Sequence, residues 1–353
     1  MSQPIDDAGT PPPGTMRAAV WDGPDTITVR DVPMPDVPDG WVLVGVEYTG
    51  ICGTDLSIVH GSHPRARAGV VPGHEIVGVV ADAGTTGLSP GSRVVAEPLI
   101  SCGECRACRS GSPHVCRDLK LFGIDAPGSL AGHVALPATA LHVLPADVPA
   151  RHAALVEPLA VAVHAVSRSG MQAGDTVAVL GGGPIGVLTA LVARESGAEQ
   201  VVVVEPRAWR RNVIAGLGLD VVPEGVEPAE HIAALTGGEG ADTTFDAAGH
   251  PAVAAQLPGV TRVLGRIVVV GVYKQPAPVD LQAVCFKEQS LVGVRVYTRD
   301  DVARAVRLVA DGELGLDRLP VAVFPLDDVA AAFDSAAAGE DNLKVLVRSG
   351  GTR

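Results

Sequence analysis

The sequence predicts a two-part α/β protein, in which an irregular all-β domain is joined to a domain built on a doubly wound parallel sheet. The first part, from Met16 to about Pro149, is broken into short β-like runs punctuated by Gly and Pro. From about Gly174, apolar runs alternate with stretches long enough for helices, which is typical of a parallel sheet. A length of 353 residues leaves room for about two domains of roughly 100–200 residues each.

Individual elements can be assigned in both parts. Short strands are predicted in the first part, for example at Trp41–Tyr48 and Ile76–Ala81. The second part opens with a βαβ unit, formed by a strand at Thr176–Leu180, a glycine turn, a helix at Pro184–Ser196 and a strand at Gln200–Val204. Further strands of this sheet are expected at Asp242–Asp246, Arg266–Val270 and Ser290–Val294.

The C-terminal tail does not fit the parallel sheet by pattern. It carries a helical segment, Asp301–Ala310, and a final apolar strand, Leu343–Val347. We therefore assign the tail back to the first domain. The first domain is expected to comprise residues 1–162 and 299–353, and the second residues 163–298.

Charge and composition exclude several classes of partner. Forty acidic against 27 basic side chains give a net charge of −13, which repels phosphate backbones and argues against nucleic acid or an anionic membrane as a partner. No window reaches the roughly 18 uninterrupted apolar residues of a membrane span. The first fifteen residues carry Asp6, Asp7 and three consecutive prolines, and we expect a short disordered lead-in there, not a signal peptide. A cytoplasmic protein is predicted.

Four cysteines follow a C-x2-C-x2-C-x7-C pattern, which lets all four sulfurs surround one tetrahedral ion. They are Cys102, Cys105, Cys108 and Cys116. Zinc is the expected ion, and because four sulfurs leave no position for water or substrate, the site would be structural. Two disulfides are the alternative, which six cysteines in 353 residues without an evident secretory segment do not favour.

A glycine-rich segment follows the first strand of the βαβ unit and reads G-x-G-x-x-G at the opening of a helix. Glycine there lets the backbone approach a pyrophosphate. The segment contains Gly181, Gly183, Pro184, Ile185 and Gly186. A tight turn alone would explain the glycines, but Glu205 ends the next apolar run, where a carboxylate accepts the ribose hydroxyls of a dinucleotide. The pattern therefore predicts an NAD site.

Three arginines close to Glu205 leave NADP as an alternative. Arg207, Arg210 or Arg211 could neutralise the 2′-phosphate of NADP, although Glu205 itself would repel that phosphate. The arginines are also explained as a solvated first turn of a helix. NAD is favoured.

Cys52 and His74 lie upstream of the four cysteines. A thiolate and an imidazole supply two of the three protein ligands of an open catalytic zinc site. Glu157 is a candidate for the third, because a carboxylate in an otherwise apolar stretch is costly unless it meets a metal or a strong donor. Glu75, next to His74, competes with it. Taken singly, Cys52 is more simply explained as a buried core thiol and His74 as a loop histidine with its hydrogen bonds satisfied.

Together and in this order, these motifs resemble the zinc-dependent medium-chain dehydrogenase/reductase family over about Met16 to Val347. The likeness is closest to the polyol, butanediol and threonine dehydrogenases, for which Gly-His-Glu, the run Val156–Val161 and the cysteine lobe are typical together. Phe286–Glu288 and Tyr297–Asp300 resemble the butanediol dehydrogenases. The resemblance implies a GroES-like, zinc-binding catalytic domain and a Rossmann NAD-binding domain, in a homodimer or homotetramer.

The resemblance also implies roles at the reaction centre. Cys52 and His74 would bind the catalytic zinc, with Glu75 and Glu157 exchanging direct or water-mediated contact with it. Asp55, three residues after Cys52, would orient the imidazole.

Two further residues receive roles by the same resemblance. Thr54 would place a hydroxyl against the substrate oxygen. Arg210, five residues after Glu205, would contact the adenosine of NAD, which weakens its interpretation as an NADP ligand.

The chain departs from the family at two places. Ser57 stands where many relatives have a relay histidine, and a serine cannot hold a proton near neutral pH. Either His60 or His63 replaces it, or protons pass to bulk water. At the substrate end, Arg295 stands one place earlier than the arginine of the sorbitol dehydrogenases and should point to the opposite face, whereas Tyr297 remains a plausible substrate ligand.

The predicted function is that of an NAD-dependent zinc alcohol dehydrogenase, with Thr54, Glu75 and Glu157 as the catalytic residues. Aromatic residues make up only 3% of the chain, which favours a small hydroxyl-rich alcohol or ketone substrate: a vicinal diol, polyol or cyclitol. L-threonine 3-dehydrogenase activity is one alternative, and a zinc-retaining binding protein without turnover is another. A zinc-free quinone or enoyl reductase would lack the cysteine lobe, and a zinc-finger nucleic-acid module disagrees with the charge.

Overall fold

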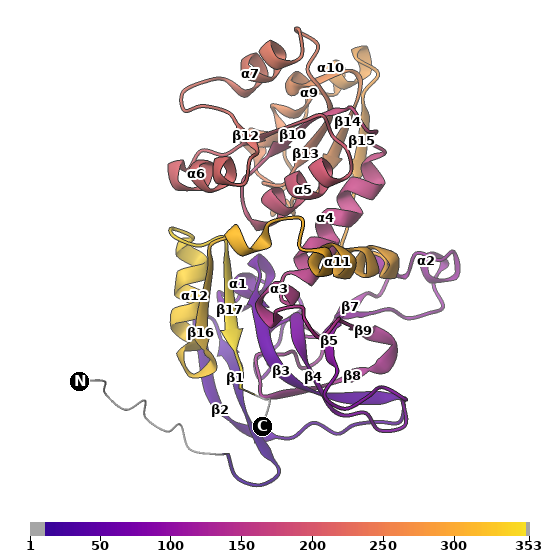
Figure 1. The fold of residues 1–353 in the computed structure, drawn as a ribbon, viewed down its shortest axis with the longest axis vertical. Coiled ribbons are helices and arrows are strands. Elements are labelled where there is room, and N and C mark those ends of the chain that lie inside the picture. The colour runs from indigo at the N-terminus through magenta and orange to yellow at the C-terminus, as the bar shows by residue number, and fades with distance from the viewer. Residues whose placement is uncertain (1–10, 351–353) are drawn as a thin grey trace, which may run out of the picture.

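Two β-sheets in separate lobes organise the chain, as the computed structural model shows for residues 11–350 (Figure 1). The lower lobe in Figure 1 holds a seven-stranded, mainly antiparallel sheet, and the upper lobe a six-stranded parallel one. This is the predicted α/β architecture. Most of the predicted lead-in falls on residues 1–10, outside the described residues.

The seven-stranded sheet has the order β16-β17-β3-β4-β5-β9, with β8 also paired to β3. Its strands are β3 (Trp41–Ile51), β4 (Glu75–Asp82), β5 (Arg93–Ala96), β8 (His133–Pro137), β9 (Leu141–Val143), β16 (Val321–Pro325) and β17 (Lys344–Arg348). β17, from the end of the chain, pairs antiparallel with β3, with Val347 opposite Thr49. The last strand of the tail therefore joins the first sheet, one residue later than predicted.

Smaller elements surround this sheet. Two short ladders pair β1 (Thr15–Gly23) with β2 (Thr26–Pro33), and β6 (Leu99–Ile100) with β7 (Lys120–Leu121). The helices are α1 (Gly53–Val59), α2 (Arg106–Arg109), α3 (Ala150–Ala153), α11 (Arg299–Asp311) and α12 (Val329–Ala338). α2 belongs to the cysteine lobe, which projects to the right in Figure 1.

The parallel sheet has the order β12-β11-β10-β13-β14-β15. Its strands are β10 (Thr176–Leu180), β11 (Gln200–Val204), β12 (Asp220–Val221), β13 (Ala241–Asp246), β14 (Thr261–Val269) and β15 (Ser290–Gly293). Five of these strands were predicted, whereas β12 was not. The helices of this lobe are α5 (Pro184–Glu195), α6 (Ala208–Gly216), α7 (Pro228–Leu235), α8 (Pro251–Ala254), α9 (Leu257–Val260) and α10 (Leu281–Phe286).

Helix α4 (Val156–Ser169) lies with α11 between the two sheets (Figure 1). It runs unbroken through residue 162, where the sequence placed a domain boundary, and ends at Gly170, whose φ of 67° terminates a helix readily. α11 begins at a capping box formed by Thr298 and Asp301. Buried side chains of both helices belong to one core that also includes strand β10. Within residues 11–350, no helix combines the length and the apolar character needed to cross a membrane.

Candidate active site

Three candidate metal ligands meet where neighbouring strands of the seven-stranded sheet lie side by side. Cys52 directly follows β3, while His74 and Glu75 stand at the start of β4, which pairs with β3 so that Gly50 faces Glu75. One ligand atom from each of Cys52, His74 and Glu75 lies within 4.8 Å of the others. Zinc prefers these donors, and three of them leave a coordination position for another molecule. The donor set therefore fits an open zinc site.

Asp55 supports His74 from the first turn of α1. Its buried carboxylate lies 3.4 Å from His74 Nδ1 and accepts the backbone N–H groups of Gly73 (3.1 Å) and Cys52 (3.0 Å). Burial would raise the pKa of Asp55, but the charge of His74 and these hydrogen bonds outweigh it, so that the pKa is lowered. This geometry suits the orienting role that the resemblance implied.

Glu75 has a buried partner that sequence reasoning missed. Lys344, the first residue of β17, places Nζ 2.5 Å from the Glu75 carboxylate and donates a hydrogen bond to the Ile51 carbonyl at 2.9 Å. Burial would lower the pKa of Lys344, but the negative charge of Glu75 and of Cys52 raises it. This shift favours the charged form of Lys344, which holds the Glu75 carboxylate in an ion pair.

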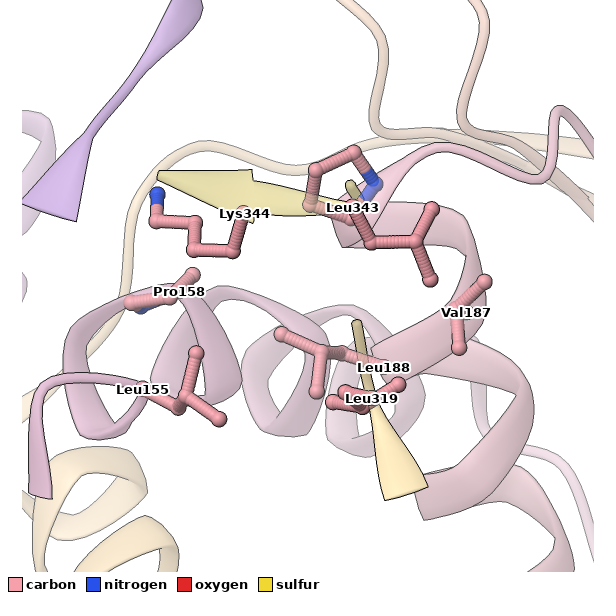
Figure 2. Close-up of a pocket in the computed structure, with 8 residues that line it drawn as sticks. Leu155, Pro158, Val187, Leu188, Leu319, Leu343 and Lys344 are labelled. Carbon is pink, nitrogen blue, oxygen red and sulfur yellow. The ribbon is translucent and has the colours of Figure 1, made fainter. Parts of the chain in front are cut away.

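Lys344 also borders a small cavity between the two lobes, which is lined mainly by apolar side chains (Figure 2). The cavity has a volume of about 10 Å³, room for about one water molecule. Its lining residues include Leu155, Pro158, Val187, Leu188, Leu319 and Leu343. Figure 2 shows the ammonium end of Lys344 pointing away from the leucine side chains. The start of α5 and the strand that carries Lys344 are thus packed together.

Glu157, the other candidate ligand, lies in the first turn of α4. It is not one of the three residues within 4.8 Å of one another. Its Oε1 accepts a hydrogen bond from the hydroxyl of buried Tyr297 at 2.8 Å. Burial and the charge of Glu75 raise the pKa of Glu157 to about 7. Arg295 is exposed, but it lies beyond β15, which ends at Gly293, so the strand alternation from which its direction was predicted does not apply there.

The proposed proton-relay residues lie on α1 and in the loop after it. The Thr54 side chain makes no hydrogen bond with residues 11–350, whereas Ser57 donates its hydroxyl to the Gly53 carbonyl at 3.0 Å. His60 is exposed, and its Nδ1 lies 2.7 Å from the Leu56 carbonyl. His63 Nδ1 accepts backbone N–H groups within its own loop. Burial and the charge of Arg65 lower the pKa of His63, which therefore favours its neutral form.

The four cysteines of the lobe converge as a closed site requires. Their sulfurs lie within 4.8 Å of one another, with Sγ–Sγ distances of 3.5 Å for Cys105–Cys108 and 4.0 Å for Cys102–Cys108 and Cys105–Cys116. Zn–S bonds of about 2.3 Å in a tetrahedron give edges of about 3.8 Å. All four are free thiols, which excludes the disulfide alternative here. Hydrogen bonds from backbone N–H groups lower the pKa of Cys105 to about 6, whereas burial and the Cys105 sulfur raise the pKa of Cys108 to about 11, so the first thiolate of the lobe forms at Cys105.

Each glycine of the G-x-G-x-x-G segment is required for a different structural reason. Gly181 turns the chain after β10 with a φ of 112°. A Cβ at Gly186 would lie 1.8 Å from the Gly181 carbonyl oxygen, so this glycine allows α5 to pack against the turn. Gly183, the N-cap of α5, would bring its Cβ no nearer than 3.9 Å to a neighbour, the Arg210 guanidinium. Open space at a helix N-terminus is where a pyrophosphate binds.

Glu205 lies beside this turn and is buried. Its carboxylate accepts the backbone N–H of Gly182 at 3.0 Å and that of Arg207 at 2.8 Å, and lies 3.7 Å from Arg210 Nη1. The Arg207 side chain instead reaches the carbonyls of Ala338 and Gly339 at the end of α12.

The Arg211 side chain is likewise held by hydrogen bonds within the chain. It donates to Glu224 at 2.5 Å and to the Pro206 carbonyl at 2.6 Å. Arg210 is therefore the arginine that remains beside both Glu205 and the open space at Gly183.

Comparisons with known proteins agree on one family for this chain. Residues 38–146 match the alcohol dehydrogenase GroES-like domain, and residues 184–311 match the zinc-binding dehydrogenase model. A 2-dehydro-3-deoxy-L-galactonate 5-dehydrogenase of Pseudoalteromonas atlantica is 41% identical, covering 87% of this chain and 91% of that protein. An erythritol/L-threitol dehydrogenase of Mycolicibacterium smegmatis is 33% identical, covering 94% and 97%. An L-threonine 3-dehydrogenase of Bacillus velezensis is also 33% identical, covering 91% and 95%.

A solved structure agrees with these sequence matches. A Sinorhizobium meliloti protein described as a zinc-binding dehydrogenase, with NADP bound, has a TM-score of 0.88 and 34% identity, covering 95% of this chain and 99% of its own. The chain therefore belongs to the zinc-dependent medium-chain dehydrogenase/reductase family, whose members are oxidoreductases that act on alcohols with zinc and a nicotinamide cofactor.

Proposed function

We propose that this enzyme transfers hydride between NAD and the secondary alcohol of a small hydroxyl-rich substrate, a vicinal diol, polyol or cyclitol. The observation that carries the proposal is the open group of Cys52, His74 and Glu75 beside the buried pair of Glu157 and Tyr297. Relatives named for erythritol or L-threitol and for a sugar acid support a substrate rich in hydroxyls.

The metal would be held by Cys52, His74 and one of the two glutamates, with Asp55 orienting His74. When bound, zinc supplies a Lewis acid that lowers the pKa of an oxygen from near 16 toward about 7, and NAD accepts the hydride. Either Glu75 or Glu157 would be the third ligand, because Lys344 forms an ion pair with Glu75.

Thr54 is proposed to relay the proton that leaves the substrate hydroxyl, because its oxygen can accept that hydrogen bond while its own hydrogen passes to the next acceptor. Its own hydroxyl has no partner among residues 11–350, so it is available for a hydrogen bond. Ser57 cannot store that proton, and its hydroxyl is already bonded to Gly53. His60, His63 or bulk water would receive the proton next.

The cofactor would lie across the carboxyl end of β10, with its pyrophosphate at Gly183 and the start of α5. The nucleotide-binding segment contains Gly181, Gly183, Pro184, Ile185, Gly186, Glu205 and Arg210. Glu205 would accept the ribose hydroxyls, which favours NAD over NADP. We assign this role to residues 163–298, and zinc binding to residues 1–162 and 299–353.

We also propose that the enzyme is a homodimer or homotetramer in the cytoplasm. β15 is the last strand of the parallel sheet, and Leu281, Phe286 and Leu291 near it are 66%, 79% and 48% exposed. An unpaired strand edge with apolar neighbours suits contact with a second copy. A thiolate metal site needs reduced cysteines, which favours a reducing compartment.

Initial rates with NAD across diols, polyols, cyclitols and L-threonine, with zinc measured on the same preparation, test the proposed function. The highest kcat/KM is expected with a polyol or diol. A preference for L-threonine would favour the alternative supported by the 33% identical relative. Full zinc and NAD binding without turnover of any alcohol would indicate a binding protein instead.

A further inference from the structure

A cavity of about 310 Å³, lined by both polar and apolar residues, lies between the cysteine lobe and the start of α11. Its lining residues include Glu97, Ser101, Thr139, Tyr297, Arg299 and Asp300. They come from two segments far apart in the sequence, residues 97–139 and 297–300. A cavity of this size, lined by a few placed polar groups, is suited to a small molecule.

Glu97 dominates the chemistry of the cavity. Its side chain is 15% exposed, and its Oε1 accepts hydrogen bonds from His142 Nε2 at 2.6 Å and Arg299 Nη1 at 2.7 Å. No hydrogen bond from residues 11–350 reaches the other carboxylate oxygen, Oε2. Two donors thus fix the carboxylate in place and leave one strong acceptor for a ligand.

The arginine in the cavity lining, Arg299, already donates its hydrogen bonds to protein acceptors. Arg299 donates to Glu97, to the Thr139 carbonyl at 2.5 Å and to the Leu141 carbonyl at 3.3 Å. Asp300 adds a second negative charge to the lining. The lining therefore carries two carboxylates against one arginine that is held by protein acceptors. Such a cavity accepts hydroxyl donors and disfavours an anion.

Tyr297 joins this cavity to the candidate active site. Its ring is part of the cavity lining, and its hydroxyl donates to Glu157 at 2.8 Å. Tyr297 is 1% exposed and therefore stands between the cavity and this candidate metal ligand. A substrate that reacts beside Glu157 and carries further carbons would enter the cavity by displacing the Tyr297 side chain.

We propose that this cavity binds the distal hydroxyl groups of a neutral polyol, with Glu97 Oε2 accepting a substrate O–H. The negative charge of Glu97 and Asp300 in the cavity lining disfavours substrates that end in a carboxylate or a phosphate. This inference rests on the proposed function and narrows its substrate class from hydroxyl-rich molecules in general to uncharged ones of four or more carbons.

The test compares 2,3-butanediol, erythritol and erythronate as substrates of the zinc-loaded enzyme with NAD. Calorimetric titration of the same three compounds provides a readout of binding without turnover. Glu97→Gln removes the charged acceptor, and Asp311→Asn, at the far end of α11, is the matched control. Thr139→Phe fills the cavity and leaves Glu97 in place, so it serves as an independent variant if the Glu97 change disturbs Arg299.

In Glu97→Gln, kcat/KM and affinity for erythritol should fall about tenfold or more, the effect of losing a hydrogen bond to a charged group. In Thr139→Phe both should also fall, because the ring occupies the space of the distal hydroxyl groups. The values for 2,3-butanediol should change less than twofold, and the control should match the wild type. In Glu97→Gln, but not in Thr139→Phe, the ratio of kcat/KM for erythronate to kcat/KM for erythritol should rise.

Equal losses for erythritol and 2,3-butanediol, or a wild-type enzyme that prefers erythronate, would overturn the cavity's role and leave the proposed function standing. A zinc-loaded wild type that oxidises no alcohol would overturn both.

Discussion

Lys344 and Glu75 form an interior ion pair that reaches across a strand. They start β17 and β4, which lie on either side of β3, and Lys344 Nζ is 2.5 Å from the Glu75 carboxylate. Gly50 of β3 lies between them, and a Cβ there would be 1.9 Å from Glu75 Oε2 and 3.0 Å from Lys344 Cε. The absence of a side chain at Gly50 therefore allows the pair to form.

Replacing Gly50 by Ala should displace the Glu75 carboxylate. The added methyl group overlaps Oε2, and overpacking of this kind costs about 1–3 kcal/mol. We expect the free energy of unfolding to fall by that amount in urea denaturation, together with zinc affinity at the Cys52 site. Gly293→Ala, in a strand position with open space, is the control. Wild-type stability and zinc affinity in Gly50→Ala would show that the pair can rearrange freely.

Glu205 should set the cofactor preference. Glu205→Ser removes both the ribose acceptor and the charge that repels a 2′-phosphate, so NADH binding should weaken roughly tenfold or more while NADP improves relative to NAD. Fluorescence titration with NADH and NADPH measures both changes. Exposed Glu199→Ser is the control. A wild-type enzyme that already prefers NADP would contradict this role for Glu205.

Thr54 should be required for alcohol oxidation. Thr54→Val keeps the shape of the side chain and removes its hydroxyl, so zinc content and NADH affinity should persist while kcat falls on the order of 10²–10⁴-fold, the usual contribution of acid–base catalysis. Steady-state rates and metal analysis of the same sample test this. Near-normal turnover would remove Thr54 from the mechanism.

Ser57 should be dispensable, and a histidine there should change the pH profile. In the wild type the Ser57 hydroxyl only bonds to the Gly53 carbonyl. Ser57→His introduces a group that titrates near 6.5, so kcat should follow that group and rise modestly below the wild-type optimum. Ser57→Ala should keep the wild-type profile. If Ser57→His also leaves the profile unchanged, the proton leaves by another route, with His60 and His63 the next residues to replace.

The two zinc sites should differ in how readily they lose metal. The group of Cys52, His74 and Glu75 is open, whereas the cysteine lobe surrounds its ion with four sulfurs. We expect two zinc ions per chain by elemental analysis, and loss of activity during dialysis against a chelator well before circular dichroism reports unfolding. A fully active chain with a single zinc ion would contradict this expectation.

The fold was predictable where a run of sequence forms one element by itself. The bounds of β10 and β11 agree with the prediction to the residue, because a buried parallel strand is apolar along its whole length and ends at glycine or a charge. β12 was missed, because its two residues, Asp220 and Val221, are too few to show a pattern. β14 begins five residues before its predicted start, ahead of an irregular pairing that breaks the alternation.

At the candidate site, the sequence identified candidate ligands, but it did not indicate the residues that contact them. Cys52 and His74 were recognised from local motifs, and the pairing of β3 with β4 brings them together. Lys344 is 269 positions from Glu75, and nothing in its local sequence indicates an ion pair. The hydrogen bond from Tyr297 to Glu157 spans 140 positions. The hydrogen bond between His142 and the Glu97 carboxylate likewise joins residues that are distant in the sequence.

The cysteine lobe has almost no apolar interior of its own, since its buried cluster consists of Cys105, Cys116 and Leu119. So small a cluster cannot offset the conformational entropy of ordering the loop, and the bound ion must supply the difference. Newly synthesised chains that fold under zinc starvation should therefore have an ordered pair of sheets and a lobe open to proteases. Cleavage around residues 102–116 would then mark, within a mixed population, the molecules that matured without metal.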